Sequence, residues 1–449
     1  MRGFVRLLAV GFACVSGSAL AQSPPPATPQ QFPGIDVWRT LNPQPPSSTQ
    51  TQPGYTTAPS SATPTGAGPG HVIGNATVYP SVTGAAFYDD NVFAANRNKQ
   101  GSWGYIVRPE IGFTLNNTPN ATINGGAYVE QRWYDRFSSE EQTNAAAAIG
   151  GTNNLDKDTQ LVGRLQYIHA HEDRGAVESQ FQQFAKPIEY NQFDAAGALN
   201  KRFDRWWMSV GAAGTWLDYS NASLSGVTVL QNYRNGDIVR VPLRVGYVVA
   251  PQTSLFVEGS YNTRDFDVGL YSSHGTRLVG GLLFEPGPGA RVKGEIFGGG
   301  MWQDYSGTAI GFRDVSTWTY GASLGFLLTN TVTATFEGRR EAREASLSGG
   351  VATGTVGDGV SVVQTVAAGR LDFLIRPDVV LSGGASYLQD EYLGAGNDNA
   401  WSPLVGIKWF VNQWLTLGAD YRGVVYDTGV IGSAGYHRNV YLLSATARF

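Results

Sequence analysis

The sequence predicts an all-β protein: a transmembrane antiparallel up-and-down β-barrel of about 18 strands, preceded by a disordered N-terminal periplasmic arm. From residue 73 onward, segments of ten to fifteen residues alternate apolar with polar or small residues, which is the period of a strand. Aromatic residues reach 12% and glycines number 57, an unusual combination for a helical enzyme. Beyond the first 21 residues no apolar run reaches the roughly 18 residues that a membrane helix needs, so a closed barrel is the remaining way to cross a bilayer.

The first 21 residues have the organisation of a signal peptide. Two arginines precede the apolar stretch Leu7–Val15, and Ala19-Leu20-Ala21 has the form of a cleavage site, so the mature chain is expected to begin at residue 22. A lipoprotein cut before Cys14 is the alternative, but Gly11 stands where that motif requires a leucine-like residue. Cys14 is the only cysteine. Cleavage would therefore leave no cysteine for a disulfide or a zinc site.

Residues 22–72 are predicted to be a disordered periplasmic linker. The stretch 22–70 contains 12 of the 22 prolines, together with many serines, threonines and glutamines. Such a composition cannot bury enough apolar surface to offset the entropy of the chain. The domain boundaries that follow are 1–21, 22–72 and 73–449.

The charge balance excludes nucleic acid as an expected partner. Lysine and arginine total 32 against 36 aspartates and glutamates, a net charge of -4, and the basic residues do not cluster.

The barrel is predicted to contain an even number of strands, as is usual for bacterial single-chain barrels. The short, alanine-rich segment 143–151 is the strand on which this count depends. The expected strands are 76–88, 103–115, 121–135, 143–151, 158–170, 189–201, 205–218, 237–249, 253–264, 274–285, 290–303, 315–328, 331–344, 361–375, 378–391, 400–410, 413–426 and 438–449.

The connections between these strands alternate between short and long. Short turns such as 250–252 and 376–377 alternate with long loops such as 171–188 and 345–360. In outer-membrane barrels the short turns are periplasmic and the long loops are external. We therefore expect the cell outer membrane as the location, with the arm and the C-terminus on the periplasmic side.

Charged residues fall on one phase of each strand. In 237–249, for example, Arg240 and Arg244 alternate with valines and leucines. A Lys or Arg that faced lipid at mid-depth would cost about 2–4 kcal/mol, so the charged phase should face the lumen. Basic residues slightly outnumber acidic ones among the expected pore-lining residues, which predicts a weak anion preference. These candidates are Arg108, Glu110, Arg164, Arg240, Arg244, Arg277, Lys293, Glu295, Glu337, Arg339, Arg370, Asp372, Lys408 and Arg422.

Aromatic residues gather near the predicted strand ends. This placement is typical of the two aromatic girdles of a membrane barrel, although aromatic residues are also enriched in strands generally. The residues concerned are Tyr167, Trp206, Trp207, Tyr261, Tyr387, Trp409 and Trp414.

The last strand has the form of an assembly signal. Tyr441, Leu443 and the terminal Phe449 share one face. A terminal strand of this kind resembles the signal that the barrel-assembly machinery reads, and it predicts that machinery as a partner, with outer-membrane lipid and lipopolysaccharide around the folded barrel.

The opening of the barrel resembles a known family. Tyr79-Pro80-Ser81-Val82 leads into Gly84-Ala85-Ala86-Phe87-Tyr88-Asp89-Asp90-Asn91-Val92-Phe93, which is similar to the putative β-barrel porin 2 family of proteobacterial outer-membrane proteins. The later hairpins resemble the same family over most of 73–449. The resemblance implies a porin role, and it also implies exopolysaccharide export, with polysaccharide export components as partners. It implies no catalytic residues.

Three local groups were weighed as binding or catalytic sites. Asp89-Asp90-Asn91 could hold a divalent cation, but Asx turns are the commoner use of such a run. His169 and His171 could ligate a metal, yet no further ligand is indicated. In Ser272-Ser273-His274 adjacent residues point to opposite faces of a strand, so these residues form no nucleophile–base pair. We therefore expect neither an enzyme nor a cofactor.

The loop 171–188 is the longest in this interpretation. In wide barrels such a loop can fold inward and narrow the pore. It would then place Glu172, Asp173, Arg174, Glu178 and Lys186 at a constriction, whereas in the alternative it lies over the rim.

The function favoured by the sequence is a porin-like channel for small solutes or an export conduit for polysaccharide. The alternative is a non-conducting structural or adhesive barrel that acts through its loops or its periplasmic arm. The sequence leaves the oligomeric state open.

Overall fold

A computed structural model describes residues 70–118, 120–175, 184–285, 287, 289–307, 311–346, 359–430 and 434–449. The predicted signal peptide 1–21 and nearly all of the predicted linker lie outside the described residues. The barrel strands are β2 (Ala76–Asp89), β3 (Ser102–Thr118), β4 (Ala121–Tyr134), β5 (Gln142–Asp156), β6 (Thr159–His171), β7 (Glu189–Phe203), β8 (Trp206–Tyr219), β11 (Gly236–Ala250), β12 (Thr253–Phe266), β13 (Ser273–Phe284), β14 (Val292–Tyr305), β15 (Val315–Leu327), β16 (Val332–Ser346), β17 (Gly359–Arg376), β18 (Val379–Tyr392), β19 (Gly396–Phe410), β20 (Leu415–Thr428) and β21 (Tyr436–Arg448).

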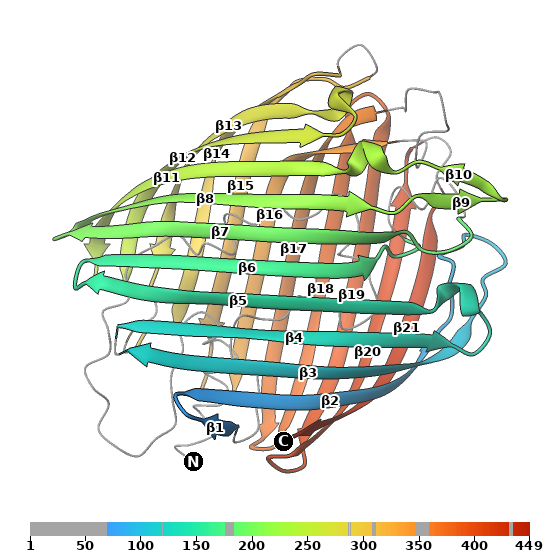
Figure 1. Cartoon of the computed structure of the whole chain (residues 1–449), viewed down its shortest axis with the longest axis horizontal. Helices are drawn as coiled ribbons and strands as arrows, with labels where there is room; N and C mark the ends of the chain where they lie inside the picture. The colour runs from blue at the N-terminus through green and yellow to red at the C-terminus, as the bar shows by residue number, and fades with distance from the viewer. Residues whose placement is uncertain are drawn as a thin grey trace.

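These eighteen strands form one closed antiparallel barrel. Each strand pairs with its neighbours in the chain, β8 pairs with β11, and β21 pairs with β2 to close the ring. In Figure 1 the strands β3–β8 of the near wall cross the strands β16–β21 of the far wall, as strands tilted around a common axis must. Among the described residues, no helix is long and apolar enough to cross a membrane.

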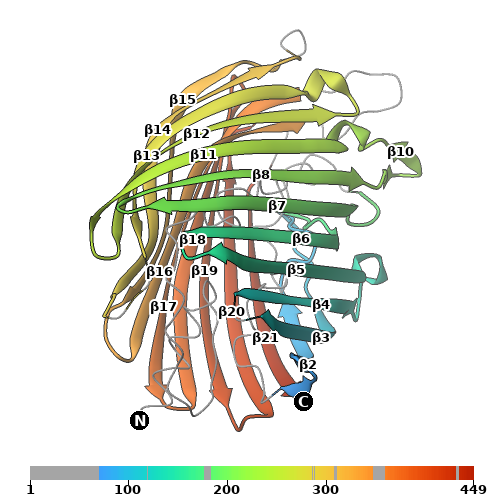
Figure 2. The ribbon, with the colours of Figure 1, turned by 60° about the vertical axis from the view of Figure 1, so that its left-hand side comes forward.

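The predicted strand order and number are confirmed. The doubtful segment 143–151 lies inside β5, which has 15 residues. Two features differ from the prediction. His71 and Val72, which the sequence analysis placed in the linker, belong to the short strand β1 (His71–Ile73), which pairs with β2. The predicted loop after β8 contains a hairpin, β9 (Ala222–Leu224) with β10 (Val227–Val229), which projects beyond the barrel in Figures 1 and 2.

The outer surface carries an apolar band between two belts of aromatic side chains. Near the loop end, exposed aromatics include Trp103, Trp216, Trp318 and Trp401. Three tyrosines of this belt donate their hydroxyls to asparagines of the next strand: Tyr167 to Asn191 (2.8 Å), Tyr387 to Asn399 (2.7 Å) and Tyr421 to Asn439 (2.9 Å). These bonds hold the polar end of each ring where membrane meets water.

One aromatic residue assigned to the belts lies elsewhere. Near the turn end, Trp206 is 57% exposed, but Trp207 is only 1% exposed and faces the barrel interior. The cause is the alternation of side chains along a strand, which sends adjacent residues to opposite faces. The prediction that both tryptophans belong to the outer belt was therefore wrong for Trp207.

Most gaps in the hydrogen-bonded ladders occur at prolines. Rungs are missing at Pro109 in the β3–β4 ladder, at Pro242 in the β8–β11 ladder and at Pro403 in the β19–β20 ladder. A proline lacks the backbone N–H that the neighbouring strand needs. The β15–β16 ladder also stops early, at Tyr320 and Arg340, although the strands continue there without a proline.

Candidate functional site

The fourteen candidate pore-lining residues all stand on the inward face of the wall. Most alternate along their strands with apolar side chains that are exposed on the outside, as Arg370 and Asp372 do with Leu371 and Phe373. Inside the barrel these charges divide into two groups, one buried among other charges and one accessible to solvent.

The buried group is built around Arg244. Its guanidinium lies 2.6 Å from Glu258 and 2.6 Å from Glu295, and Arg277 adds a third contact to Glu258 at 2.5 Å. Arg244 is fully buried and also lies over the ring of Phe256. On β3, Arg108 is similarly buried, 3.3 Å from Glu110 of the same strand and 3.9 Å from Glu130 of β4. The ion pairs of Arg244 and Arg277 connect β11, β12, β13 and β14, and the charges of both groups are matched locally.

The accessible group lies on β16–β20. Glu337, Arg370 and Lys408 are exposed, while Asp372 is half-buried and lies 2.8 Å from Arg370. The other half-buried candidates are Arg164, Arg240, Lys293, Arg339 and Arg422. A solute entering from the turn end would meet this accessible set first.

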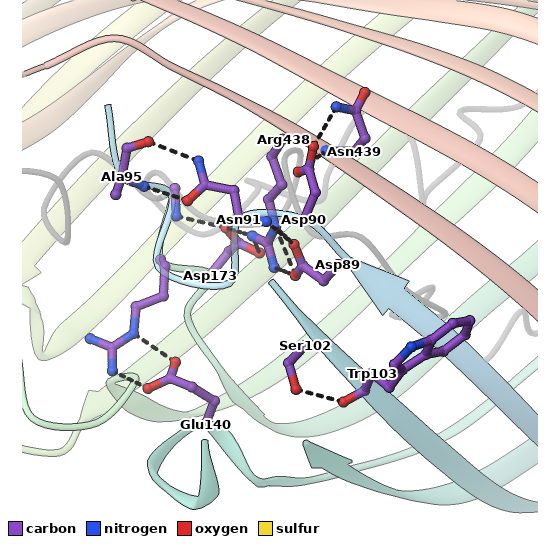
Figure 3. A network of polar contacts seen from close by, with 12 residues as sticks. Asp89, Asp90, Asn91, Ala95, Ser102, Trp103, Glu140, Asp173, Arg438 and Asn439 are labelled. Carbon is purple, nitrogen blue, oxygen red and sulfur yellow. Dashed lines mark hydrogen bonds and ion pairs between the residues drawn. The ribbon is translucent and has the colours of Figure 1, made fainter. Parts of the chain in front are cut away.

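The loop that follows β6 turns into the barrel at the loop end. Asp173 accepts two hydrogen bonds of 3.0 Å from Arg438, which also binds Asp89 of β2 (Figure 3). Arg174 donates to Glu140 of the short helix η1 (Ser138–Glu140) at 2.6 and 2.8 Å. All five side chains are buried.

A fourth ion pair fixes the start of the same loop. Glu172 pairs with Arg234 of η2 (Asn232–Arg234), and both side chains are buried. In the ring β6 and β21 are separated by β2–β5, and Arg438 is buried on the inner face, so the loop reaches it on the inner side of the wall. We call the four ion pairs Asp173–Arg438, Asp89–Arg438, Arg174–Glu140 and Glu172–Arg234 the loop-end latch.

The latch alters the expectation for this loop. Glu172, Asp173 and Arg174 do lie inside the barrel, but each is matched by an opposite charge and does not form part of an open constriction. Lys186 is exposed. Glu178 lies outside the described residues.

A second element also enters the interior. At the loop end, 341–346 of β16 no longer pair with β15 but stay paired with 359–364 of β17, and 362–365 of β17 stay paired with β18. We call this part of the hairpin the tucked end. Its Glu344 lies 2.8 Å from Arg264 of β12 and accepts a 3.0 Å hydrogen bond from Ser273 of β13. Arg264 and Ser273 point to the inside of the barrel, so the tucked end lies on the inner side of β12–β14.

The Asp89-Asp90-Asn91 run is engaged in protein contacts. Asp89 binds Arg438, Asp90 accepts a 2.7 Å hydrogen bond from the Asn439 side chain, and the Asn91 amide donates to Asp89 at 3.0 Å in an Asx turn. This is the commoner use that the sequence analysis described. In the described part of the chain no group of three or more His, Cys, Asp or Glu residues could hold a metal ion.

The histidine and serine candidates also have structural partners. His169 contacts Asn191 at 3.0 Å, and His171 contacts Asn144 at 3.1 Å. Ser273 is buried against Glu344, whereas His274 is exposed beside Asp304. The two side chains face opposite sides of the wall, as their adjacency requires.

The candidate assembly residues share the outer face of β21. Tyr441, Leu443 and Phe449 are each more than half exposed. The amide of Phe449 donates to Pro80 of β2 at 3.0 Å, so the chain end lies on the seam that closes the ring.

Several residues of the site were not singled out from the sequence. Arg438, Glu140 and Arg234 of the latch were missed, because their partners in it lie at least 34 positions away along the chain and leave no local pattern. The tucked end did leave a signal: in Arg339–Glu344 charges occur on both phases of the strand, which is incompatible with one face in lipid.

One protein family and several solved structures are similar to this chain. The sequence model of the family described as putative beta-barrel porin 2 matches residues 63–449. No curated protein matches the sequence. Similar solved structures include OpdK from Pseudomonas aeruginosa, with 10% identity over 83% of this chain and 99% of that chain and a TM-score of 0.42. They also include the siderophore receptor PirA from Pseudomonas aeruginosa, with 11% identity over 83% and 80% and a TM-score of 0.38.

Proposed function

The chain belongs to the putative beta-barrel porin 2 family, and from this premise we propose that it is an outer-membrane channel for small hydrophilic solutes, closed at its loop end in the conformation described. The observation that carries the proposal is an eighteen-stranded wall whose inner face has charged residues that are accessible on β16–β20 and buried at the loop end. Arg370 and Lys408 are solvent-accessible, whereas the latch and the tucked end are buried. A ring of this strand number encloses a lumen wide enough for water and small solutes.

The accessible charges support a weak anion preference. Arg370 and Lys408 are exposed on the inner face, and Arg370 is the more exposed partner of its pair with Asp372. Charges that a permeating ion can approach select by sign, whereas Arg244 is shielded between Glu258 and Glu295. We propose that the loop end is external and that both ends of the barrel sequence are periplasmic, following the alternation of short turns and long loops.

Solute size provides the first test. Full-length protein refolded into liposomes should admit small sugars and exclude larger oligosaccharides in a swelling assay. Liposomes carrying equal amounts of heat-denatured protein are the control. Swelling that is no faster with folded barrel than with this control would overturn the proposal.

A non-conducting barrel is the second candidate, and the closed loop end favours it. If the latch and the tucked end never move, the barrel acts as a scaffold through its loops. Polysaccharide export, which the family resemblance implies, would require both obstructions to leave the lumen together. A barrel that remains impermeable after the latch is broken would support the scaffold.

A further inference from the structure

The seam between β15 and β16 at the loop end differs from every other strand boundary of the described barrel. β15 pairs with β14 up to Val315, and β16 pairs with β17 up to Ser346. Between β15 and β16 the ladder covers only Tyr320–Leu327 and Thr333–Arg340. For the remaining length, the wall is closed by contacts of side chains and not by a backbone ladder.

This difference determines where the wall could open sideways. Backbone hydrogen bonds broken in a membrane cannot be replaced by water, and each costs several kcal/mol, so complete ladders resist lateral opening. At the seam no such bonds link 315–319 to 341–346. Opening there requires side-chain contacts to separate, among them the Arg264–Glu344 ion pair, but breaks no backbone ladder.

The free edge of the tucked end is satisfied by side chains. The hydroxyl of Thr319 donates to the carbonyl of Arg340 at 2.8 Å, and Arg264 donates to the carbonyl of Ala342 at 2.9 Å. Polar backbone groups on an uncovered edge normally attract another strand. Here side chains bond two carbonyls of the edge, so these carbonyls need no neighbouring strand. The seam is therefore stabilised by specific contacts.

The seam has two sides, which we call leaves: β14–β15 with the segment before β15 on one side, and the tucked end on the other. The two leaves overlap and pack through an apolar layer. Phe312, Val315 and Met301 of the β14–β15 leaf pack with Ala342 and Val363 of the tucked end. The segment before β15 is also held to β17, since the Arg313 amide donates to the Ser361 hydroxyl at 2.9 Å. Further aromatic residues complete the same layer: Tyr233, Phe266, Tyr271 and Tyr305.

The passage between the leaves changes character from outside to inside. At its outer mouth Trp318 is 77% exposed and Tyr320 is 46% exposed, at the level of the loop-end aromatic belt. Buried charges adjoin the apolar layer: Glu344 pairs with Arg264 between the tucked end and the inner wall, and Arg343 pairs with Asp390 on the inner face. An apolar chain matches the chemistry of the layer, and a polar head group matches that of the charges.

We propose that this seam is a lateral passage through which a single-chain amphiphile exchanges between the loop-end leaflet of the membrane and the barrel interior. The apolar layer accepts the chain, and the charged groups that adjoin it accept the head. The proposal gives the channel a second class of ligand, and it rests on the proposed function only for the onward route through the lumen.

The test compares two buried alanines in full-length protein carrying Cys14→Ala. Ala342→Cys places a thiol in the apolar layer of the seam, where Ala342 is 4% exposed. Ala213→Cys is the matched control, because Ala213 is 5% exposed on the inner wall and is itself paired on both sides, with Arg240 of β11 and Ala196 of β7. N-dodecylmaleimide, dissolved in the liposome membrane, serves as an amphiphilic probe, and a sulfonated maleimide reports access from water.

The dodecyl reagent should modify Ala342→Cys at least about tenfold faster than Ala213→Cys, because the seam opens without breaking a ladder. Equal rates would overturn the proposal, as would modification of Ala342→Cys by the sulfonated reagent alone. Val363→Cys is the second reporter if Ala342→Cys does not fold. Because labelling needs no ion flow, a labelled but non-conducting barrel would support the lateral passage while rejecting the channel.

Discussion

At the scale of single residues, the inward charges differ by how completely they are matched. Arg438 lies between Asp89 and Asp173 and is 3% exposed, whereas Lys408 is open to solvent. A buried charge whose partner is removed retains its desolvation penalty, while an exposed charge chiefly sets the local potential. Replacing a matched buried charge should therefore lower the stability of the barrel, whereas replacing an accessible charge should change its ion selectivity.

Replacing Arg438 should destabilise the barrel. Arg438→Gln leaves two buried carboxylates without their cation, which we expect to lower the free energy of unfolding by about 3–5 kcal/mol. Urea titration of the refolded protein in vesicles measures this change. Arg376→Gln is the control, since Arg376 is 69% exposed beside Asp378 and an exposed pair contributes at most about 1 kcal/mol. Equal losses for both variants would contradict the latch.

Selectivity should respond to Lys408 and not to Arg244. Lys408→Glu reverses an accessible charge and should shift the anion-to-cation permeability ratio toward cations, by about twofold. The reversal potential in a salt gradient measures the ratio. Arg244→Gln, which alters only a shielded group, should leave that potential unchanged in the fraction of protein that folds. A shift with Arg244→Gln alone would contradict the division into accessible and buried charges.

The sequence predicted the facing of individual residues better than their partners. The alternation of apolar and charged residues placed all fourteen candidates on the inner face, because facing is a property of one strand. The partnership of Asp173 with Arg438 joins residues 265 positions apart, and no period in the sequence records it. Trp207 could have been placed from the exposed Trp206 beside it.

At the scale of elements, the wall is uneven where the tucked end departs from β15. The residues 315–319 keep one hydrogen-bonded neighbour, while 320–327 keep two. A strand edge with a missing partner opens more readily than one within a complete ladder. The amides of 315–319 should therefore exchange with solvent faster than amides that are paired on both sides.

Hydrogen exchange should locate the seam. We expect faster exchange of the amides in 315–319 than in 299–303 of β14, which lie at the same level and pair on both sides. Peptide-resolved mass spectrometry of the refolded barrel measures both stretches in one experiment. Equal protection would contradict a seam closed only by side chains.

The last strand should control assembly. Deleting Phe449 removes an exposed aromatic group and the amide that donates to Pro80, so the yield of heat-modifiable barrel in the outer membrane should fall several-fold. Phe203→Ala is the control, because Phe203 is 53% exposed but lies in an internal strand. Gel mobility with and without boiling measures the folded fraction. Equal yields would contradict a special role for the C-terminal residue.

Strand number and order could be predicted because each strand carries its own period and its own turn. The tucked end was missed because period two continues through it: Val363 keeps the outward phase of β17 but is 2% exposed. The outward face of the tucked end packs against the inner side of β12 and β13 and does not face lipid. Only the charges on both phases of Arg339–Glu344 distinguish this segment from an ordinary membrane strand.

At the scale of the whole molecule, the barrel combines a stable wall with a closure made of separable parts. The wall is held by ladders that close through β2 and β21. The closure is held by the side-chain ion pairs of the latch and by the packing of the tucked end. A channel built in this way can change its opening without unfolding its wall.

The most direct test of this account is the single-channel conductance of the full-length barrel in planar bilayers, for the wild type and for Arg174→Gln. Arg174 joins the inward loop to Glu140 and takes no part in the strand ladders. The account predicts brief or rare openings of the wild type and longer openings of the variant, because removing one ion pair frees the loop. Silence from both proteins, in samples shown to be folded by heat modifiability, would contradict the channel and leave a scaffold.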